Sequence, residues 1–254
     1  SVPVPEWGFS STPRVFGDQL VLEGGRVASF DKQTGKLLWQ SAEHEAGYGS
    51  IAPLEFHGRL LFASLDCEGL RVLDSQDGTE LAYYEWLSPF GTNSTTPIVQ
   101  GDKIFISTGY NVGCGLFQFT GNSLELVYQS RDMRNHFNNS ILIDGHLYGF
   151  DGNSNLGRVV QLTCLDFETG ETKWQQAGYG CGSLMAADGK LLVLSDHGVL
   201  AVVEANPKTF GELARADILT NRCWTVPILA DGHVFARNAR GKLVCVKLPQ
   251  SPAD

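Results

Sequence analysis

Side chains that could bind a ligand gather in five short segments of this 254-residue chain. The segments combine amides, two guanidinium groups, an imidazole and aromatic rings with neighbouring glycines. Such a mixture suits a polar or anionic small ligand, or a peptide segment of a partner protein, better than a purely structural plug. We predict that the binding residues are Tyr48, Asn93, Arg134, His136, Asn138, Cys181, Arg222 and Trp224.

These residues also have structural interpretations. His136 suits a hydrogen-bonded loop histidine, and the two arginines can bind loop carbonyls or form ion pairs between repeats. Trp224 fits packing between repeats as well as stacking on a ligand. Asn93 and Asn138 are residues of the type that caps turns through its own side chain. Both interpretations stay open at this stage.

Familiar catalytic motifs do not occur in the sequence. It contains no Gly-x-Ser-x-Gly elbow, no His-Glu-x-x-His pair and no phosphate-binding glycine loop followed by lysine. Residues 149–155 are rich in oxygen ligands but lack the terminal bidentate glutamate of an EF-hand, which favours a solvated hairpin loop. We therefore predict no catalytic residue and no metal site.

The charge and hydropathy patterns exclude other classes of protein. The net charge is −9, and no stretch gathers lysine and arginine into a phosphate-tracking patch, so we predict no nucleic-acid partner. No apolar run approaches the roughly 20 residues of a membrane-spanning helix, so we predict no transmembrane span. Residues 1–7 lack the basic and apolar regions of a signal peptide.

The six cysteines include no Cys-x-x-Cys spacing and no adjacent pair. Cys164 and Cys245 occupy equivalent places in two apolar segments, and we expect them to be small buried side chains. Cys114 and Cys181 lie in Gly-Cys-Gly segments, and Cys223 precedes a tryptophan. These three are candidates for a disulfide or a reactive thiol, although spacing alone gives no pairing.

A repeat of about 43 residues organises the whole chain. Each copy begins with an apolar run containing a glycine turn, in residues 13–20, 53–60, 97–104, 140–147, 184–191 and 227–234. The turn is Gly-Asp or Asp-Gly in five copies and His-Gly in the second. Short apolar runs with glycine-centred turns at this period are typical of four-stranded β units that stack on their neighbours. Single units cannot bury both sheet faces, so radial packing around a channel is expected.

We therefore predict an all-β fold, a β-propeller of four-stranded antiparallel blades that forms one domain over residues 1–254. Six repeats are visible, and the alternative is part of a seven- or eight-bladed ring. In a propeller the loops that lead into the innermost strands converge at the mouth of the channel. The eight candidate residues fall in those loops.

The first repeat indicates how a blade is built. Its predicted strands are residues 13–16, 19–23, 26–31 and 36–40, and residues 31–35 form an Asp-x-x-Thr-Gly turn whose glycine can adopt positive φ. Related turns recur at residues 74–78 and 166–170. Trp39 and Trp174 follow these aspartates by eight residues, where an indole can wedge between blades and bury roughly 200 Å². Ala82 takes this place in the second repeat, and Trp86 nearby is expected to compensate.

The sixth repeat ends at residue 248 and supplies only three predicted strands. Residues 1–7 could provide the fourth strand and close the ring, although Pro3 and Pro5 are tolerated only at edges or strand ends. The alternative is that residues 1–7 are the tail of a deleted upstream blade.

At these residues the chain resembles the PQQ-like β-propeller repeat proteins. The matching elements are residues 31–39 and 166–174, the repeated Gly-Asp and Asp-Gly hairpins, and residues 241–246. That family includes quinoprotein alcohol dehydrogenases, polyvinyl-alcohol dehydrogenase-like proteins and the periplasmic scaffold lipoprotein of outer-membrane barrel assembly. Its members usually have seven or eight blades, whereas this chain supplies six.

The resemblance implies a periplasmic or extracellular protein and, in its quinoprotein members, PQQ with Ca²⁺ held between a tryptophan and a vicinal Cys–Cys disulfide. Trp224 is the candidate tryptophan, but the sequence has no adjacent cysteines and no haem-attachment motif. We therefore expect no cofactor and a monomeric binding or scaffold protein with a protein partner or a small polar ligand. The alternative is a PQQ-dependent alcohol or polyvinyl-alcohol dehydrogenase-like quinoprotein.

Overall fold

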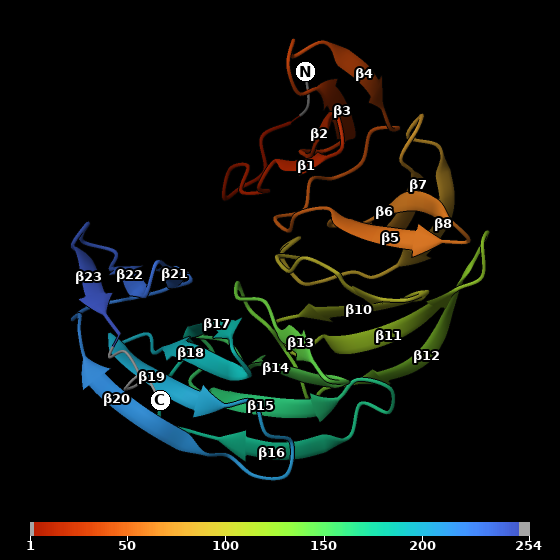
Figure 1. Cartoon of the computed structure of the whole chain (residues 1–254). Coiled ribbons are helices and arrows are strands. Elements are labelled where there is room, and N and C mark those ends of the chain that lie inside the picture. The colour runs from red at the N-terminus through yellow and green to blue at the C-terminus, as the bar shows by residue number, and fades with distance from the viewer. Residues whose placement is uncertain (1–2, 249–254) are drawn as a thin grey trace. The chain divides into compact units, whose positions relative to one another are not determined.

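The computed structural model describes residues 3–248, and every regular element in this part of the chain is a β-strand (Figure 1). The strands form six antiparallel sheets, and within each sheet the strands pair in the order of the sequence. This arrangement confirms the predicted all-β class and the six blades. No helix in residues 3–248 is long and apolar enough to cross a membrane.

The chain divides into two compact units, Ser1–Phe137 and Asn138–Asp254, and each holds three sheets. In unit 1 the strands are β1 (Arg14–Phe16), β2 (Gln19–Glu23), β3 (Val27–Asp31), β4 (Leu37–Gln40), β5 (Ala52–Phe56), β6 (Arg59–Leu65), β7 (Gly69–Asp74), β8 (Glu80–Glu85), β9 (Ile98–Gln100), β10 (Lys103–Thr108), β11 (Gly113–Phe119) and β12 (Leu124–Ser130). Each group of four consecutive strands is one blade.

Unit 2 contains two four-stranded blades and one sheet of three strands. Its strands are β13 (Ile141–Ile143), β14 (His146–Asp151), β15 (Gln161–Asp166), β16 (Thr172–Gln176), β17 (Ser183–Ala187), β18 (Lys190–Leu194), β19 (Val199–Glu204), β20 (Glu212–Asp217), β21 (Ile228–Ala230), β22 (His233–Arg237) and β23 (Leu243–Lys247). Residues 3–7 form no strand, so within the described residues the N-terminal segment does not complete a sheet; residues 1–2 lie outside them. Pro3 and Pro5 explain this, because proline donates no backbone hydrogen bond to a neighbouring strand.

The alternation of strand direction places the candidate loops at one end of each blade. The turn between a blade's second and third strands lies at the same end as the connection from its fourth strand to the next blade. We call this the connection end. In unit 1 it carries the turns at residues 24–26, 66–68 and 109–112 and the connections at residues 41–51 and 86–97.

Two tryptophans seal the seams between blades, as predicted. Trp39 on β4 donates its indole N–H to the carbonyl of Ser75 in the next blade, at 3.0 Å, and packs in a buried cluster with Phe62. Trp174 on β16 donates its indole N–H to the carbonyl of Asn206 in the blade that follows, at 2.8 Å. Each bond joins the fourth strand of one blade to the turn after the third strand of the next blade.

Trp86 compensates for Ala82, also as predicted. Its buried indole donates to Thr108 Oγ1 of the third blade at 3.0 Å and meets the Phe117 ring edge-on at 6.0 Å. The second seam is therefore filled from the connection end of β8 instead of from within the strand.

The Asp-x-x-Thr-Gly turns close as the sequence predicts. Asp31 Oδ1 accepts hydrogen bonds from the backbone N–H groups of Gln33 and Thr34 at 3.1 and 2.7 Å. Gly35 has a φ of 70° and donates its N–H to the Asp31 carbonyl at 2.8 Å. The turn needs glycine there because other residues rarely adopt this conformation.

Each four-stranded blade contains a β-bulge at the same place, which the sequence did not reveal. The fourth strand holds one extra residue against the third strand, and that residue directly precedes the seam position. The extra residues are Leu38, Leu81, Val127, Lys173 and Leu213. A bulge increases local twist and redirects the following side chain.

Candidate functional site

The eight predicted binding residues divide evenly between the two units. Tyr48, Asn93, Arg134 and His136 belong to unit 1, and Asn138, Cys181, Arg222 and Trp224 belong to unit 2. A single site built from all eight stays a prediction, and the surroundings of each set are described within its own unit.

Asn93 is fully buried and its side chain holds two blades together. Its Nδ2 donates to the carbonyls of Asp66 and Trp86, both at 2.7 Å, and its Oδ1 accepts from Thr108 Oγ1 at 2.9 Å. Its backbone carbonyl accepts the N–H of Tyr48 at 2.9 Å. These bonds give the amide a structural role beneath the connection end.

His136 belongs to a row of aromatic rings at the connection end. Its Nε2 lies 3.1 Å from the Tyr110 hydroxyl, and the two rings meet edge-on at 5.1 Å. Tyr110 in turn contacts Phe90, with ring centroids 5.3 Å apart. Burial lowers the pKa of His136, so its ring is neutral near pH 7. Arg134 donates to Asn111 Oδ1 beside this row at 3.4 Å.

The backbone beneath this aromatic row is strained. Phe90, Tyr110 and Asn111 have φ angles of 68°, 53° and 63°, in the left-handed region. Such conformations cost roughly 1–3 kcal/mol each for non-glycine residues, and they cluster at ligand sites. Sequence reasoning missed Phe90 and Tyr110, because no local motif marks an aromatic residue with positive φ.

A cavity of about 550 Å³ lies at the connection end of unit 1, beside Tyr48. We call it the acidic cavity, and its lining is Pro3, Val4, Pro5, Glu6, Glu43, His44, Glu45, Ala46, Tyr48, Glu68, Phe90 and Gly91. The N-terminal segment, one blade connection, one turn and a second connection each supply part of this wall. Its four glutamates come from three separate segments, which is why the sequence did not reveal them as a group.

Two of these four carboxylates have a cationic partner. Glu43 pairs with Arg26 at 2.6 Å, and Glu68 pairs with Arg71. Glu6 and Glu45 make no ion pair with any residue among 3–248. The cavity therefore carries uncompensated negative charge.

Two neighbouring groups respond to this charge. Burial, with the charges of Glu6 and Glu45 adding to it, raises the pKa of the Tyr48 hydroxyl. Burial and then Glu45 raise the pKa of the Cys67 thiol to about 12. Both shifts have the sign that a negative potential produces, because it disfavours phenolate and thiolate.

A buried charge cluster lies behind the acidic cavity, between the first two blades. His44 Nε2 is 3.1 Å from Glu23 Oε1 and 3.8 Å from Asp66 Oδ2, and all three side chains are almost fully buried. Arg71 Nε pairs with Asp66 Oδ2 at 2.5 Å. Arg71 also pairs with Glu80 at 2.6 Å, so one guanidinium serves several carboxylates.

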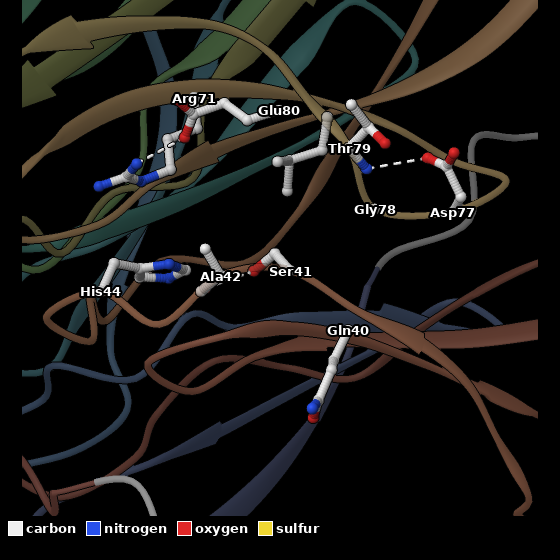
Figure 2. A pocket seen from close by; sticks show the side chains of 10 residues that line it. Gln40, Ser41, Ala42, His44, Arg71, Asp77, Gly78, Thr79 and Glu80 are labelled. Atoms are coloured by element: carbon white, nitrogen blue, oxygen red, sulfur yellow. Dashed lines mark hydrogen bonds and ion pairs between the residues drawn. The ribbon is translucent and has the colours of Figure 1, made fainter.

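His44 and Arg71 also line a smaller cavity of about 270 Å³. Figure 2 shows the Arg71–Glu80 ion pair on one side of this cavity and His44 on the other. His44 thus lines both the smaller cavity and the acidic cavity. Sequence reasoning missed this cluster because its charged residues come from two blades.

In unit 2, Asn138 and Cys181 are buried together. Asn138 Nδ2 donates to the carbonyl of Gly182 at 2.5 Å, and the backbone N–H of Cys181 donates to Asp196 Oδ2 at 3.1 Å. Gly180 has a φ of 59°, and a Cβ there would lie 2.1 Å from the Asp196 carboxylate, so glycine is required. Both predicted residues thus serve to fix this loop.

Arg222 and Trp224 form an exposed cation–π pair in unit 2. The guanidinium carbon lies 4.2 Å from the indole centroid. Trp224 is 37% exposed, so its ring is more accessible than the buried seam residue Trp39. One face of the indole is covered by the arginine.

All six cysteines are free thiols, so of the two alternatives for Cys114, Cys181 and Cys223 the disulfide does not form. Cys164 is buried, as expected, and pairs with Trp174 of the fourth strand in the register of the sheet. The expectation for Cys245 is wrong, because Cys245 is exposed. Its strand β23 has no fourth strand beside it in the described sheet.

We expect Ellman's reagent to modify one thiol per native chain and six after unfolding in urea. Burial excludes the reagent from the other five thiols, and it raises the pKa of Cys181 to about 12 and of Cys114 to about 11. The Cys245→Ser variant should lose the native reaction. Rapid reaction of a second native thiol would contradict the burial described.

No group of three or more His, Cys, Asp or Glu side chains within residues 3–248 is arranged to hold a metal ion.

A family model described as outer membrane protein assembly factor BamB matches residues 2–176 of the chain. No curated protein matches the sequence. Several solved structures are similar in fold. The computationally designed Ika8 protein aligns with a TM-score of 0.70 and 12% identity, over 94% of this chain and 70% of that protein.

Two natural proteins give similar alignments. Quinohemoprotein alcohol dehydrogenase from Comamonas testosteroni has a TM-score of 0.61 and 14% identity, over 84% of this chain and 43% of the enzyme. The β-propeller domain of Cps50 (Swd1) from Myceliophteria thermophila has a TM-score of 0.57 and 15% identity, over 96% of this chain and 88% of that domain. At these identities the structural similarity establishes the fold, a β-propeller. Because the family model covers more than half of the sequence, the chain belongs to the family of the outer membrane protein assembly factor BamB, built from PQQ-like repeats.

Proposed function

We propose that this protein is a non-catalytic binding protein that works outside the cytoplasm and recognises a partner through the connection end of its blades. The observation that carries the proposal is the acidic cavity, where four carboxylates and the rings of Tyr48 and Phe90 come together from loops at the connection end of the first blades. Binding sites are commonly concave, mainly apolar and supplied with a few polar groups.

The structural roles of several predicted residues support a binding function over a catalytic one. The amides of Asn93 and Asn138 hold loops and blades together. The thiol of Cys181 has its pKa raised to about 12 by burial, so it is a poor nucleophile at neutral pH. Recognition then falls to Tyr48, Phe90 and the carboxylates beside them.

The family supports a protein partner and an extracytoplasmic location. Its description names an assembly factor of outer membrane proteins. Such a factor works next to other proteins and close to the outer membrane, which agrees with a partner-binding propeller.

The residues of the acidic cavity do not fit PQQ. This cofactor is a planar tricarboxylate, and a wall containing four carboxylates would repel it. A PQQ-dependent dehydrogenase therefore receives no support from this cavity, and we derive no reaction through the cofactor.

The proposal is tested by incubating the full chain with PQQ and Ca²⁺ and measuring dye-linked oxidation of short alcohols and polyvinyl alcohol. We expect the rate to equal that of PQQ and Ca²⁺ without protein. A quinoprotein alcohol dehydrogenase assayed in the same mixture serves as the positive control. Sustained turnover by this chain would overturn the proposal.

A further inference from the structure

The charge of the acidic cavity selects a cationic ligand. Glu6 and Glu45 enter the cavity without an ion pair in the described residues, whereas Glu43 and Glu68 have arginine partners. A cation between the two unpaired carboxylates would form charge-assisted hydrogen bonds, which are stronger than neutral ones.

The size and lining of the cavity favour an organic cation over a metal ion. The cavity holds about 550 Å³, which is far more than a single ion fills. Its carboxylates do not belong to any metal-holding group of three His, Cys, Asp or Glu side chains in residues 3–248. Val4, Ala46 and Phe90 add apolar surface for an aliphatic stem, and Tyr48 offers an aromatic ring to a cation.

The rim of the cavity favours a peptide over a free amine. Val4 is 71% exposed and Phe90 is 74% exposed, and both line the cavity. Trp7, 69% exposed, lies beside Tyr48 of the cavity lining, since its backbone N–H donates to the Tyr48 hydroxyl at 3.4 Å. This apolar border is surface that a chain of residues can cover and a small amine cannot.

We infer that the acidic cavity of unit 1 binds a basic, extended segment of a partner protein, with a lysine or arginine side chain inserted between Glu6 and Glu45. The inference rests on the proposed function and specifies its partner. The aliphatic part of the inserted side chain lies against Val4 and Phe90, and neighbouring residues of the segment cover the apolar rim.

The test measures fluorescence anisotropy of a labelled peptide of alternating lysine and valine, titrated with the full chain. We expect saturable binding that weakens as the salt concentration rises, because screening reduces exposed charge interactions. The same peptide with acetylated lysines should bind at least about tenfold more weakly, since it keeps the length of the side chains and loses their charge.

The double variant Glu6→Gln with Glu45→Gln is expected to weaken binding of the lysine peptide about tenfold. Its matched control is Glu55→Gln with Glu125→Gln, which removes two exposed glutamates of the same unit on β5 and β12. The control should stay within about twofold of the wild type, because its charges lie outside the cavity. An equal loss of affinity in both double variants would mean that only the net charge of the protein matters, and it would overturn the inference.

Phe90→Gly provides a second, independent variant. Glycine accepts the positive φ of this position without strain, so the loop keeps its conformation while the aromatic wall is removed. We expect binding to weaken by about fivefold. Unchanged binding, or competition by spermidine as effective as unlabelled peptide, would contradict a peptide lying across the rim.

The peptide assay contains no PQQ, so its result is independent of the turnover assay. Peptide binding together with PQQ-dependent turnover would overturn the proposed function and keep the peptide site. Absence of both turnover and peptide binding would overturn the peptide site and keep a non-catalytic propeller.

Discussion

Replacing Asp66 by alanine is expected to lower the free energy of unfolding by about 3–5 kcal/mol, the loss typical of a broken buried ion pair. Asp66 is completely buried. Its Oδ1 accepts the N–H groups of Glu68 and Gly69 at 2.8 and 2.9 Å, and its Oδ2 pairs with Arg71 at 2.5 Å. Alanine would leave two backbone donors and part of a buried cation without partners. Urea unfolding followed by circular dichroism measures the change.

Two further variants separate the sources of this loss. Asp66→Asn keeps an oxygen for the two backbone donors and removes the charge. It should therefore lower the free energy of unfolding by about half as much as Asp66→Ala. Asp102→Ala removes an exposed aspartate from a turn of the same unit and should change stability by less than about 0.5 kcal/mol. A loss below about 1 kcal/mol for Asp66→Ala would show that the charge cluster contributes little.

Trp39→Ala is expected to lower the free energy of unfolding by about 3–5 kcal/mol, because it leaves a cavity in the seam between the first two blades. The indole packs against Phe62 and over Gly78, where a Cβ would lie 2.5 Å from the ring. The variant also leaves the Ser75 carbonyl without its donor. Trp39→Phe keeps a ring in the seam and should lose about half as much.

Trp7→Ala is the matched control, because this tryptophan is 69% exposed. We expect it to change stability by less than about 0.5 kcal/mol. If Trp39→Ala changes the free energy of unfolding no more than Trp7→Ala in the same urea titration, the packing described for the seam is contradicted.

The repeat and the seam residues could be predicted from the sequence because each depends on short segments. An Asp-x-x-Thr-Gly turn closes through bonds within five residues, as at Asp31, and an indole eight residues later reaches the next blade. Even the replacement of Ala82 by Trp86 follows from local spacing. Local patterns determine where strands begin and end, and the period determines how sheets follow one another.

The acidic cavity and the charge cluster could not be predicted in the same way. Glu6, Glu45 and Glu68 look like ordinary surface charges in the sequence and meet only when the connections of the first two blades fold together. The positive φ of Phe90 has no local signal, and the exposure of Cys245 depends on a strand that its sheet lacks. Such features arise from contacts between segments that are distant in sequence.

The bulge that precedes every seam position has a consequence for the history of the chain. Because the extra residue sits inside each of the five four-stranded repeats, as Leu38 and Lys173 do, each of these blades supplies its own curvature. A gene duplication that copies one repeat therefore also copies the geometry needed to fit the next neighbour. Whole repeats of this kind can be gained or lost while the remaining blades keep their shape.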